Sequence, residues 1–292
     1  MTRASMIPLP ASLAGWPLLV VGFALGACVG SFLNVCIHRL PEEESVVWPG
    51  SRCPRCAAAI AWYDNVPLLS WLWLGARCRR CGGRISARYP LVEATAGALA
   101  VLALWTFGPT PQALVAFAFT AALLLVTAVD LDHLFIPDEV SLPGILVGLG
   151  AALLPGGIGL ADAFLGAVAG GGILWAIAWT YERLTHVEGM GFGDVKLLAM
   201  IGAFLGWQVI PAVLVIASVS GTLVGLGTMA ARSPGRASRR VVARFGVRAL
   251  LPHLQRTARR TAIPFGPFLA LGALVATYVP VTALPWRLAF HG

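Results

Sequence analysis

Two sets of side chains in this sequence have types and spacings suited to chemistry, and the first is a group of four cysteines. Cys53 and Cys56 form one C-x-x-C pair, and Cys78 and Cys81 form a second pair, with 21 residues between the two pairs. Each pair can turn two thiolates toward one ion, and four thiolates suit tetrahedral zinc. The spacing therefore predicts a zinc-ribbon-like loop whose metal is structural, because four thiolates leave no open position for substrate or water.

The same cysteines allow two other interpretations. The four thiols can form disulfides, or one pair can cycle in thiol redox chemistry. A reducing compartment disfavours disulfides, and two matched pairs favour a metal over a redox site. The remaining cysteines, Cys28 and Cys36, lie in an apolar run and are interpreted as small packing residues.

The second set consists of carboxylates at the edges of uncharged runs. Asp130 ends a run that begins after Glu93, and Asp194 follows a glycine-rich stretch, Gly189-Met190-Gly191-Phe192-Gly193. An ionisable group at membrane depth is costly, so each such acid is a functional candidate. The glycines allow unusual backbone conformations and a close approach by another chain.

Two carboxylates close together share a proton, so that one acts as a general base on water while the other polarises a carbonyl. We therefore expect Asp130 and Asp194 to meet from different helices. A proton or cation pathway is the alternative use of such acids. Asp132 is interpreted as facing water, and Asp138, which follows Pro137, as a helix cap.

The composition predicts the elements that must position these groups. The 292 residues are 58% hydrophobic and 12% charged, with a mean hydropathy of +0.81. A soluble domain carries about 25% charged residues, so soluble and disordered classes are excluded. The apolar runs predict an all-α polytopic membrane protein of about eight transmembrane helices. The spans are expected in Trp16–Ile37, two between Glu93 and Asp130 with a turn at 108–111, Glu139–Leu154, Ala163–Tyr181, two in Leu197–Ala231, and Ile263–Leu284.

Basic residues predict the orientation. If the chain crosses the membrane eight times, the segments 38–92, 131–138, 182–196 and 232–262 all lie on one face of it. These segments hold 19 of the 21 lysines and arginines. That face is expected to be cytoplasmic, with both termini outside. The net charge of +8 reflects this asymmetry, and it would attract anionic lipid. Nucleic acid is not an expected partner, because base-reading aromatic and polar residues are not interleaved with the arginines.

Five segments follow from this organisation. They are a first transmembrane helix (1–37), a zinc-binding loop domain (38–89), a transmembrane core of helices two to seven (90–231), a basic cytoplasmic loop (232–262), and a last helix with the C-terminus (263–292). The basic loop holds nine arginines among amphipathic apolar residues, which favours lipid or partner binding. A solvated insertion explains the charge equally well.

Several motifs, taken in order, resemble the type IV prepilin leader peptidases, which are membrane-embedded aspartic peptidases. The motifs are Gly30-Ser-Phe-Leu-Asn-Val-Cys-Ile-His-Arg-Leu-Pro41, the segment from Pro49 through the first cysteine pair, Trp62-Tyr-Asp-Asn-Val-Pro67, Cys78 through Pro90 into Val92-Glu93, Asp130 with Ile136-Pro137-Asp138, the Gly-Phe-Gly-Asp turn through Lys196, and Ile263-Pro-Phe-Gly-Pro-Phe268. The resemblance covers nearly the whole chain. The basic loop is longer than this family leads us to expect.

The resemblance implies an enzyme of the bacterial inner membrane. It would cleave the basic leader of type IV prepilins or type II secretion pseudopilins after a glycine, in contact with pilus or secretion machinery. It would also methylate the new N-terminus with S-adenosylmethionine. The resemblance implies that Asp130 and Asp194 are catalytic. Supporting residues are expected to be Gly191, Gly193, Asp138 and Lys196, and candidates for methyl-donor binding in the N-terminal region are Gly30, Asn34, Arg39 and Glu44.

Three competing functions remain at this point. A thiol redox membrane enzyme would use the cysteine pairs without zinc. An ion-coupled transporter would use the intramembrane acids, although no convincing internal repeat supports it. A non-catalytic scaffold of the same family would not need the intact Asp130 and Asp194.

Overall fold

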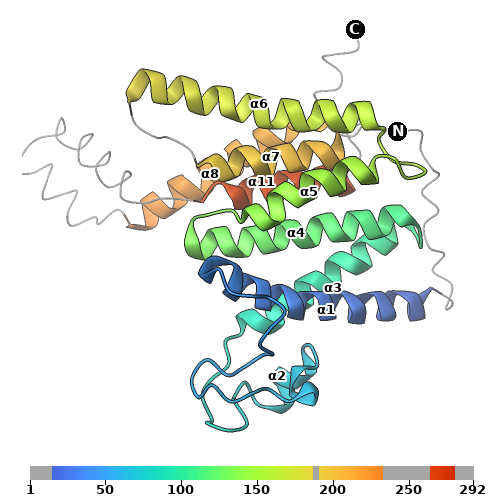
Figure 1. The fold of residues 1–292 in the computed structure, drawn as a ribbon, viewed down its shortest axis with the longest axis vertical. Coiled ribbons are helices and arrows are strands. Elements are labelled where there is room, and N and C mark those ends of the chain that lie inside the picture. The colour runs from blue at the N-terminus through green and yellow to red at the C-terminus, as the bar shows by residue number, and fades with distance from the viewer. Residues whose placement is uncertain (1–14, 187–190, 233–263, 280–292) are drawn as a thin grey trace, which may run out of the picture.

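The computed structural model describes residues 15–186, 191–232 and 264–279, and these residues form a helical bundle with a loop domain at its side (Figure 1). Gly189 and Met190 of the glycine-rich stretch lie outside these residues, and so does all of the basic 232–262 loop except Arg232. The bundle helices are α1 (Trp16–Arg39), α3 (Arg88–Phe107), α4 (Pro111–His133), α5 (Asp138–Ala151), α6 (Leu160–Thr185), α7 (Phe192–Leu205), α8 (Ile210–Arg232) and α11 (Gly266–Tyr278).

The described residues confirm a mostly helical membrane protein. Five helices, or helices with a short flanking turn, are long and apolar enough to cross a membrane, namely those built on α1, α3, α4, α6 and α8. The helices α5, α7 and α11 have 14, 14 and 13 residues. The expected break in the long run after Glu93 is present, because α3 ends before Gly108 at a φ of 66° and α4 begins at Pro111.

Small residues allow two helix pairs to pack closely. A side chain on Gly26 of α1 would come within 2.8 Å of the Ala96 carbonyl oxygen on α3. A side chain on Gly166 of α6 would come within 2.1 Å of the carbonyl oxygen of Gly202 on α7. Such contacts are typical of membrane helices, where packing rather than hydrophobic burial drives association. Figure 1 shows the α6–α7 pair and the α1–α3 pair on opposite sides of α4.

The core lies around α4 and α7, which carry the two candidate aspartates. Leu197, Leu198, Met200 and Ile201 of α7 are fully buried, and they share one cluster with Phe119 of α4 and Leu269 of α11. The first of the two spans expected in Leu197–Ala231 corresponds to α7, and much of it is buried in the protein. Both aspartates therefore stand on helices that the bundle holds firmly.

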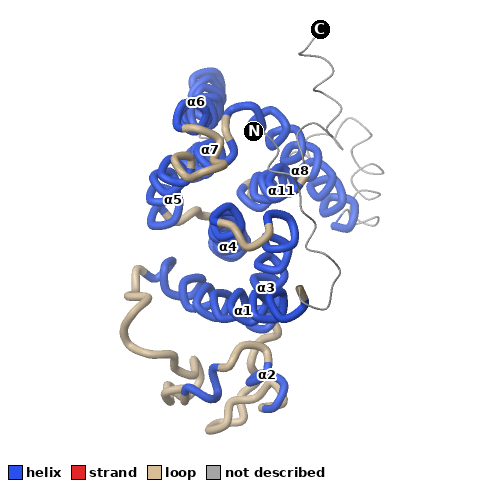
Figure 2. The backbone as a smooth tube through the Cα atoms, turned by 90° about the vertical axis from the view of Figure 1, so that its right-hand side faces the viewer, coloured by secondary structure: helices blue, strands red, loops and turns tan. Residues whose placement is uncertain are grey.

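The loop domain joins the ends of α1 and α3. It contains the short helix α2 (Leu69–Trp73), two 3-10 turns (Leu40–Glu42 and Trp62–Asn65), and isolated bridges instead of strands among the described residues. Figures 1 and 2, which differ by a quarter turn, both show it beside α1 and α3, away from α6, α7 and α8.

Candidate active site and metal centre

The four paired cysteines converge on one point of the loop domain. The Sγ atoms of Cys53, Cys56, Cys78 and Cys81 all lie within 4.8 Å of one another, and those of Cys53 and Cys81 are 3.9 Å apart. Ligands about 2.3 Å from a tetrahedral zinc ion are about 3.8 Å from each other. The donor set and its spacing therefore fit a four-thiolate metal site.

The two cysteine pairs have the same local fold, displaced by 25 residues along the chain. The N–H of Cys53 donates to the carbonyl oxygen of Ala58, and the N–H of Cys78 donates to that of Gly83. Ala57 and Gly82 occupy equivalent left-handed positions, at φ values of 54° and 66°. Two equivalent turns facing one another are the arrangement that a ribbon-type metal site requires.

The backbone around the first cysteine pair favours a thiolate at Cys53 in particular. Backbone N–H groups of Cys56 and Arg55 lower the pKa of Cys53 to about 6. Arg79 makes a two-point ion pair with Asp64, with distances of 2.8 and 2.6 Å. This contact lowers the pKa of Asp64, and it ties the second cysteine pair to the turn at Trp62–Asn65.

Asp130 is buried at the end of α4 beside the start of α11. Asp130 is only 5% exposed, and its Oδ2 accepts a hydrogen bond of 3.0 Å from the N–H of Gly266. Gly266 is the first residue of α11, so the positive end of that helix faces the carboxylate. The helix start thus holds Asp130 in one orientation.

Asp194 lies in the first turn of α7 and is half-buried. Asp194 lies near Asp130, because Ile136 is within 3.0 Å of a side chain added at Gly193, directly before Asp194, and within 3.2 Å of one added at Gly266, which bonds Asp130. The two acids stand on different helices and are 64 residues apart in sequence. The structure therefore brings together the pair that the sequence analysis placed at one site.

Neither Gly191 nor Gly193, beside Asp194, has a positive φ, and only Gly193 lies close to another segment. Gly191 has an ordinary extended conformation, with φ −69° and ψ 141°, and open surroundings. A side chain on Gly193 would lie 3.0 Å from Cβ of Ile136. The expectation of a strained turn does not hold at these two positions, because α7 starts directly after Gly191.

Asp138 and Lys196 form an ion pair next to this site. The Nζ of Lys196 lies 2.6 Å from each carboxylate oxygen of Asp138. Asp138 was expected to cap its helix, but the N-cap of α5 is Pro137 and no side chain caps it. The pair instead links the first turn of α5 to the first turn of α7, two residues beyond Asp194.

Three of the four methyl-donor candidates make contacts that hold the chain together. A side chain on Gly30 would lie 2.7 Å from the Glu93 backbone, and the Asn34 amide donates to the Tyr89 carbonyl oxygen at 3.1 Å. Arg39 donates to the carbonyl oxygens of Ser45 and Pro49. Glu44 is exposed. These contacts give Gly30, Asn34 and Arg39 a structural role, whether or not they also touch a ligand.

Residues outside the expected site also hold it in place. Gly266 lies in the Pro-Phe-Gly-Pro-Phe motif, but nothing in the sequence connects that motif to Asp130. Arg88 donates to the Ala128 carbonyl oxygen at 3.0 Å and pairs with Asp132, so it holds the last turns of α4 on both sides of Asp130. Only the folding of distant segments onto α4 makes these roles visible.

Comparisons with known proteins agree with this arrangement. Residues 24–107 match the bacterial peptidase A24 N-terminal domain, and residues 117–226 match the type IV leader peptidase family. A prepilin leader peptidase/N-methyltransferase of Aeromonas salmonicida is 37% identical, over 94% of this chain and 95% of its own. One of Burkholderia pseudomallei is 39% identical, over 89% and 85%.

A protein of the same name from Myxococcus xanthus is 44% identical over 74% of this chain and 65% of its own. No solved structure matches the chain. The two aligned family regions divide at the α3–α4 turn, so that the cysteine loop falls in the first and both candidate aspartates fall in the second. The chain belongs to the type IV leader peptidase family.

Proposed function

We propose that this chain is an intramembrane aspartic endopeptidase that removes the leader of type IV prepilins or type II secretion pseudopilins after a glycine. The carrying observation is the meeting of two acids from separate helices. Asp130 is buried and oriented by Gly266, and Asp194 lies near it in the first turn of α7. The curated relatives named prepilin leader peptidase/N-methyltransferase support the same reaction.

The two carboxyl groups divide the chemistry of peptide hydrolysis. Because like charges at close range resist joint ionisation, the pair holds one shared proton. The ionised carboxylate takes a proton from water, whose oxygen attacks the scissile carbonyl carbon while the protonated partner donates to the carbonyl oxygen. On collapse of the tetrahedral intermediate, the proton on the former carbonyl oxygen returns to the second carboxylate and the C–N bond breaks. The departing amine takes up the proton that the first carboxylate had removed from water. The hydrogen bond from Gly266 favours Asp130 as the ionised partner.

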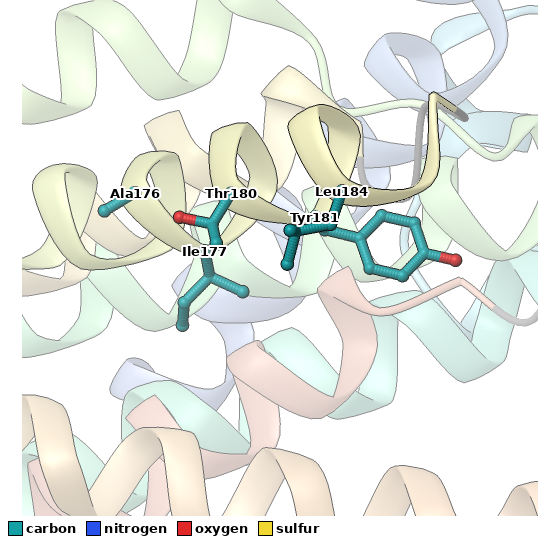
Figure 3. A pocket seen from close by; sticks show the side chains of 5 residues that line it. All are labelled: Ala176, Ile177, Thr180, Tyr181 and Leu184. Carbon is teal, nitrogen blue, oxygen red and sulfur yellow. The ribbon is translucent and has the colours of Figure 1, made fainter.

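The substrate helix enters sideways from the lipid, with its leader in the cytoplasm. Figure 3 shows a surface hollow on the last turns of α6, lined by Ala176, Ile177, Thr180, Tyr181 and Leu184. Gly166 and Gly170, which pack on α7, lie earlier on the same face of α6. An apolar helix lying against this hollow would therefore follow the face of α6 that carries α7 and would lie beside the start of α7, where Asp194 stands.

The enzyme's cytoplasmic face is basic and would repel the basic leader of the substrate. Binding of the leader therefore requires acidic residues on that face. Glu182 lines a second hollow at the end of α6, together with Trp179, Arg183 and His186. Glu42, Glu43 and Glu44 are exposed just beyond α1. We assign these acids to leader binding, and charge reversal at 42–44 is expected to change the dependence of cleavage on leader charge.

The proposal includes methylation of the new N-terminus, with S-adenosylmethionine as the methyl donor. The printed names of the relatives support this second activity. The loop domain between α1 and α3 is the expected location, with zinc in the four-cysteine site as its structural metal. Because Gly30, Asn34 and Arg39 already have contacts within the chain, no residue is assigned to the methyl donor itself.

Topology completes the proposal. The helices α1, α3, α4, α5, α6, α7, α8 and α11 would be eight spans, with both termini outside and the active site at the cytoplasmic face of the bacterial inner membrane. Asp130 and Asp194 would be supported by the ion pair of Asp138 with Lys196 and by the glycines Gly191 and Gly193. Pilus or type II secretion machinery would be the expected neighbour.

The test uses full-length protein in detergent with a prepilin substrate and S-adenosylmethionine, and the product mass is measured. Cleavage after the leader glycine and a further mass increase of one methyl group are expected. Asp194→Asn should abolish cleavage, whereas Asp162→Asn should not, because Asp162 lies in the first turn of α6 and bonds to Trp207 and Gln208. Clear cleavage by Asp194→Asn would refute the aspartic mechanism.

A further inference from the structure

The loop domain carries an apolar surface that no described part of the chain covers. Trp62 is 83% exposed, Leu69 55%, Leu72 65% and Trp73 54%. The last three belong to α2, and we call these four residues the α2 surface. Large exposed apolar patches on otherwise folded domains mark contacts with a partner or a membrane.

A hydrogen bond fixes the depth of this surface relative to the bundle. The N–H of Leu68, directly before α2, donates to the Oε2 of Glu93 at 2.7 Å. Glu93 is the sixth residue of α3, a helix long and apolar enough to span a membrane. The bond is made by the side chain of Glu93, which on a helix points back toward the N-terminus, so α2 starts beside the first two turns of α3.

The position of the domain leaves the bilayer as its nearest neighbour. Both views of the fold place the domain laterally beyond α1 and α3 rather than under the centre of the bundle (Figures 1 and 2). These two helices carry exposed apolar side chains, including Phe32 of α1 and Leu91 of α3. The α2 surface thus lies beside two helices that themselves expose apolar side chains to lipid.

The charge of the domain complements an anionic lipid surface. Between Ser45 and Ala87 the only acidic residue is Asp64, which is paired with Arg79. The exposed arginines of this segment are Arg52, Arg55, Arg77, Arg79, Arg80 and Arg84. Tryptophan is enriched at membrane interfaces, and clustered arginines near the surface attract anionic headgroups.

We propose that the loop domain docks on the membrane leaflet from which it emerges, with Trp62, Leu69, Leu72 and Trp73 inserted at the boundary of headgroups and acyl chains. Anionic phospholipid headgroups bind the exposed arginines around this surface. The hydrogen bond from Leu68 to Glu93 and the packing of α1 on α3 hold the domain at that height. This inference concerns lipid binding and does not depend on the peptidase assignment.

Photo-crosslinking on full-length protein tests the proposal. The probe p-benzoylphenylalanine replaces Leu72, in vesicles of phosphatidylethanolamine and phosphatidylglycerol that contain an alkyne-tagged phospholipid. Position 25, which is 63% exposed in the middle of α1, is the lipid-facing control. Position 43, exposed just after α1, is the water-facing control. All three sites are exposed, so the probe should not disturb folding, and one bound zinc per chain verifies the loop domain.

Lipid labelling at position 72 should approach that at position 25 and exceed that at position 43 several-fold. Labelling of added prepilin at position 72 in place of lipid would overturn the proposal in favour of a substrate-docking surface. Labelling no greater than at position 43 would show a water-exposed surface and would also overturn it. Replacing phosphatidylglycerol by phosphatidylcholine should reduce labelling at position 72 but not at position 25, and equal labelling would refute the role of the arginines.

Discussion

The N–H of Gly266 donates a 3.0 Å hydrogen bond to Oδ2 of Asp130, across 136 residues of sequence. This contact joins the start of α11 to the last turns of α4 in a buried place. It explains why a glycine stands there, because a side chain on Gly266 would lie 2.5 Å from the same oxygen. The relationship gives the first residue of α11 a positioning role at the proposed active site.

Gly266→Ala should therefore reduce cleavage by on the order of 10²-fold, since a shift of about 1 Å in a reacting group has that effect. The expected loss is in kcat more than in KM, because the substrate-binding surfaces remain. Gly227→Ala on α8, where no atom lies within 4 Å of an added Cβ, is the matched control and should be unaffected. Wild-type kcat in Gly266→Ala would remove the positioning role.

The ion pair between Asp138 and Lys196 should stabilise the start of α7 only modestly. Asp138 is 52% exposed, and exposed pairs contribute about 1 kcal/mol or less. We expect Lys196→Met and Asp138→Asn each to lower kcat, and the double variant to resemble either single variant because the same contact is lost. A double-mutant cycle of cleavage rates measures this coupling, and full additivity would show that the two residues act separately.

Metal binding should need all four clustered cysteines. Cys53→Ser or Cys81→Ser should lose the bound zinc and increase protease sensitivity in 45–87, because the loop domain has little core of its own. Cys28→Ser should retain one zinc per chain, since Cys28 is exposed on α1 and outside the cluster. Elemental analysis and limited proteolysis measure both effects. A zinc content unchanged in Cys53→Ser would exclude the four-thiolate site.

The two equivalent cysteine turns predict opposite effects of reciprocal substitutions. Ala57 has a φ of 54° where the matching turn has Gly82. A left-handed conformation costs a non-glycine residue roughly 1–2 kcal/mol. Ala57→Gly should thus slow zinc loss to a chelator, and Gly82→Ala should accelerate it. Because no atom lies within 4 Å of a side chain added at Gly82, the expected effect of Gly82→Ala comes from the backbone conformation rather than from a steric clash. The same direction of change in both variants would contradict the equivalence of the turns.

The sequence by itself determined the apolar helices, the paired cysteines and the two candidate aspartates. Hydropathy and residue spacing are local properties, so a run such as Trp16–Ile37 or a C-x-x-C pair can be recognised without a fold. The turn at Gly108 was also predictable, because glycine and proline interrupt helices through their own backbone chemistry. The family motifs gave the same elements a common function.

Tertiary structure decided which partners these residues have. Neither the contact of Gly266 with Asp130 nor that of Leu68 with Glu93 has a sequence signal, because each depends on how distant helices pack. The same applies to Asp138, which local sequence predicted as a cap and which pairs with Lys196 on another helix. Packing also showed that Gly193 leaves space for Ile136. The spacing of glycines in the sequence cannot distinguish this need for space from the need for a turn.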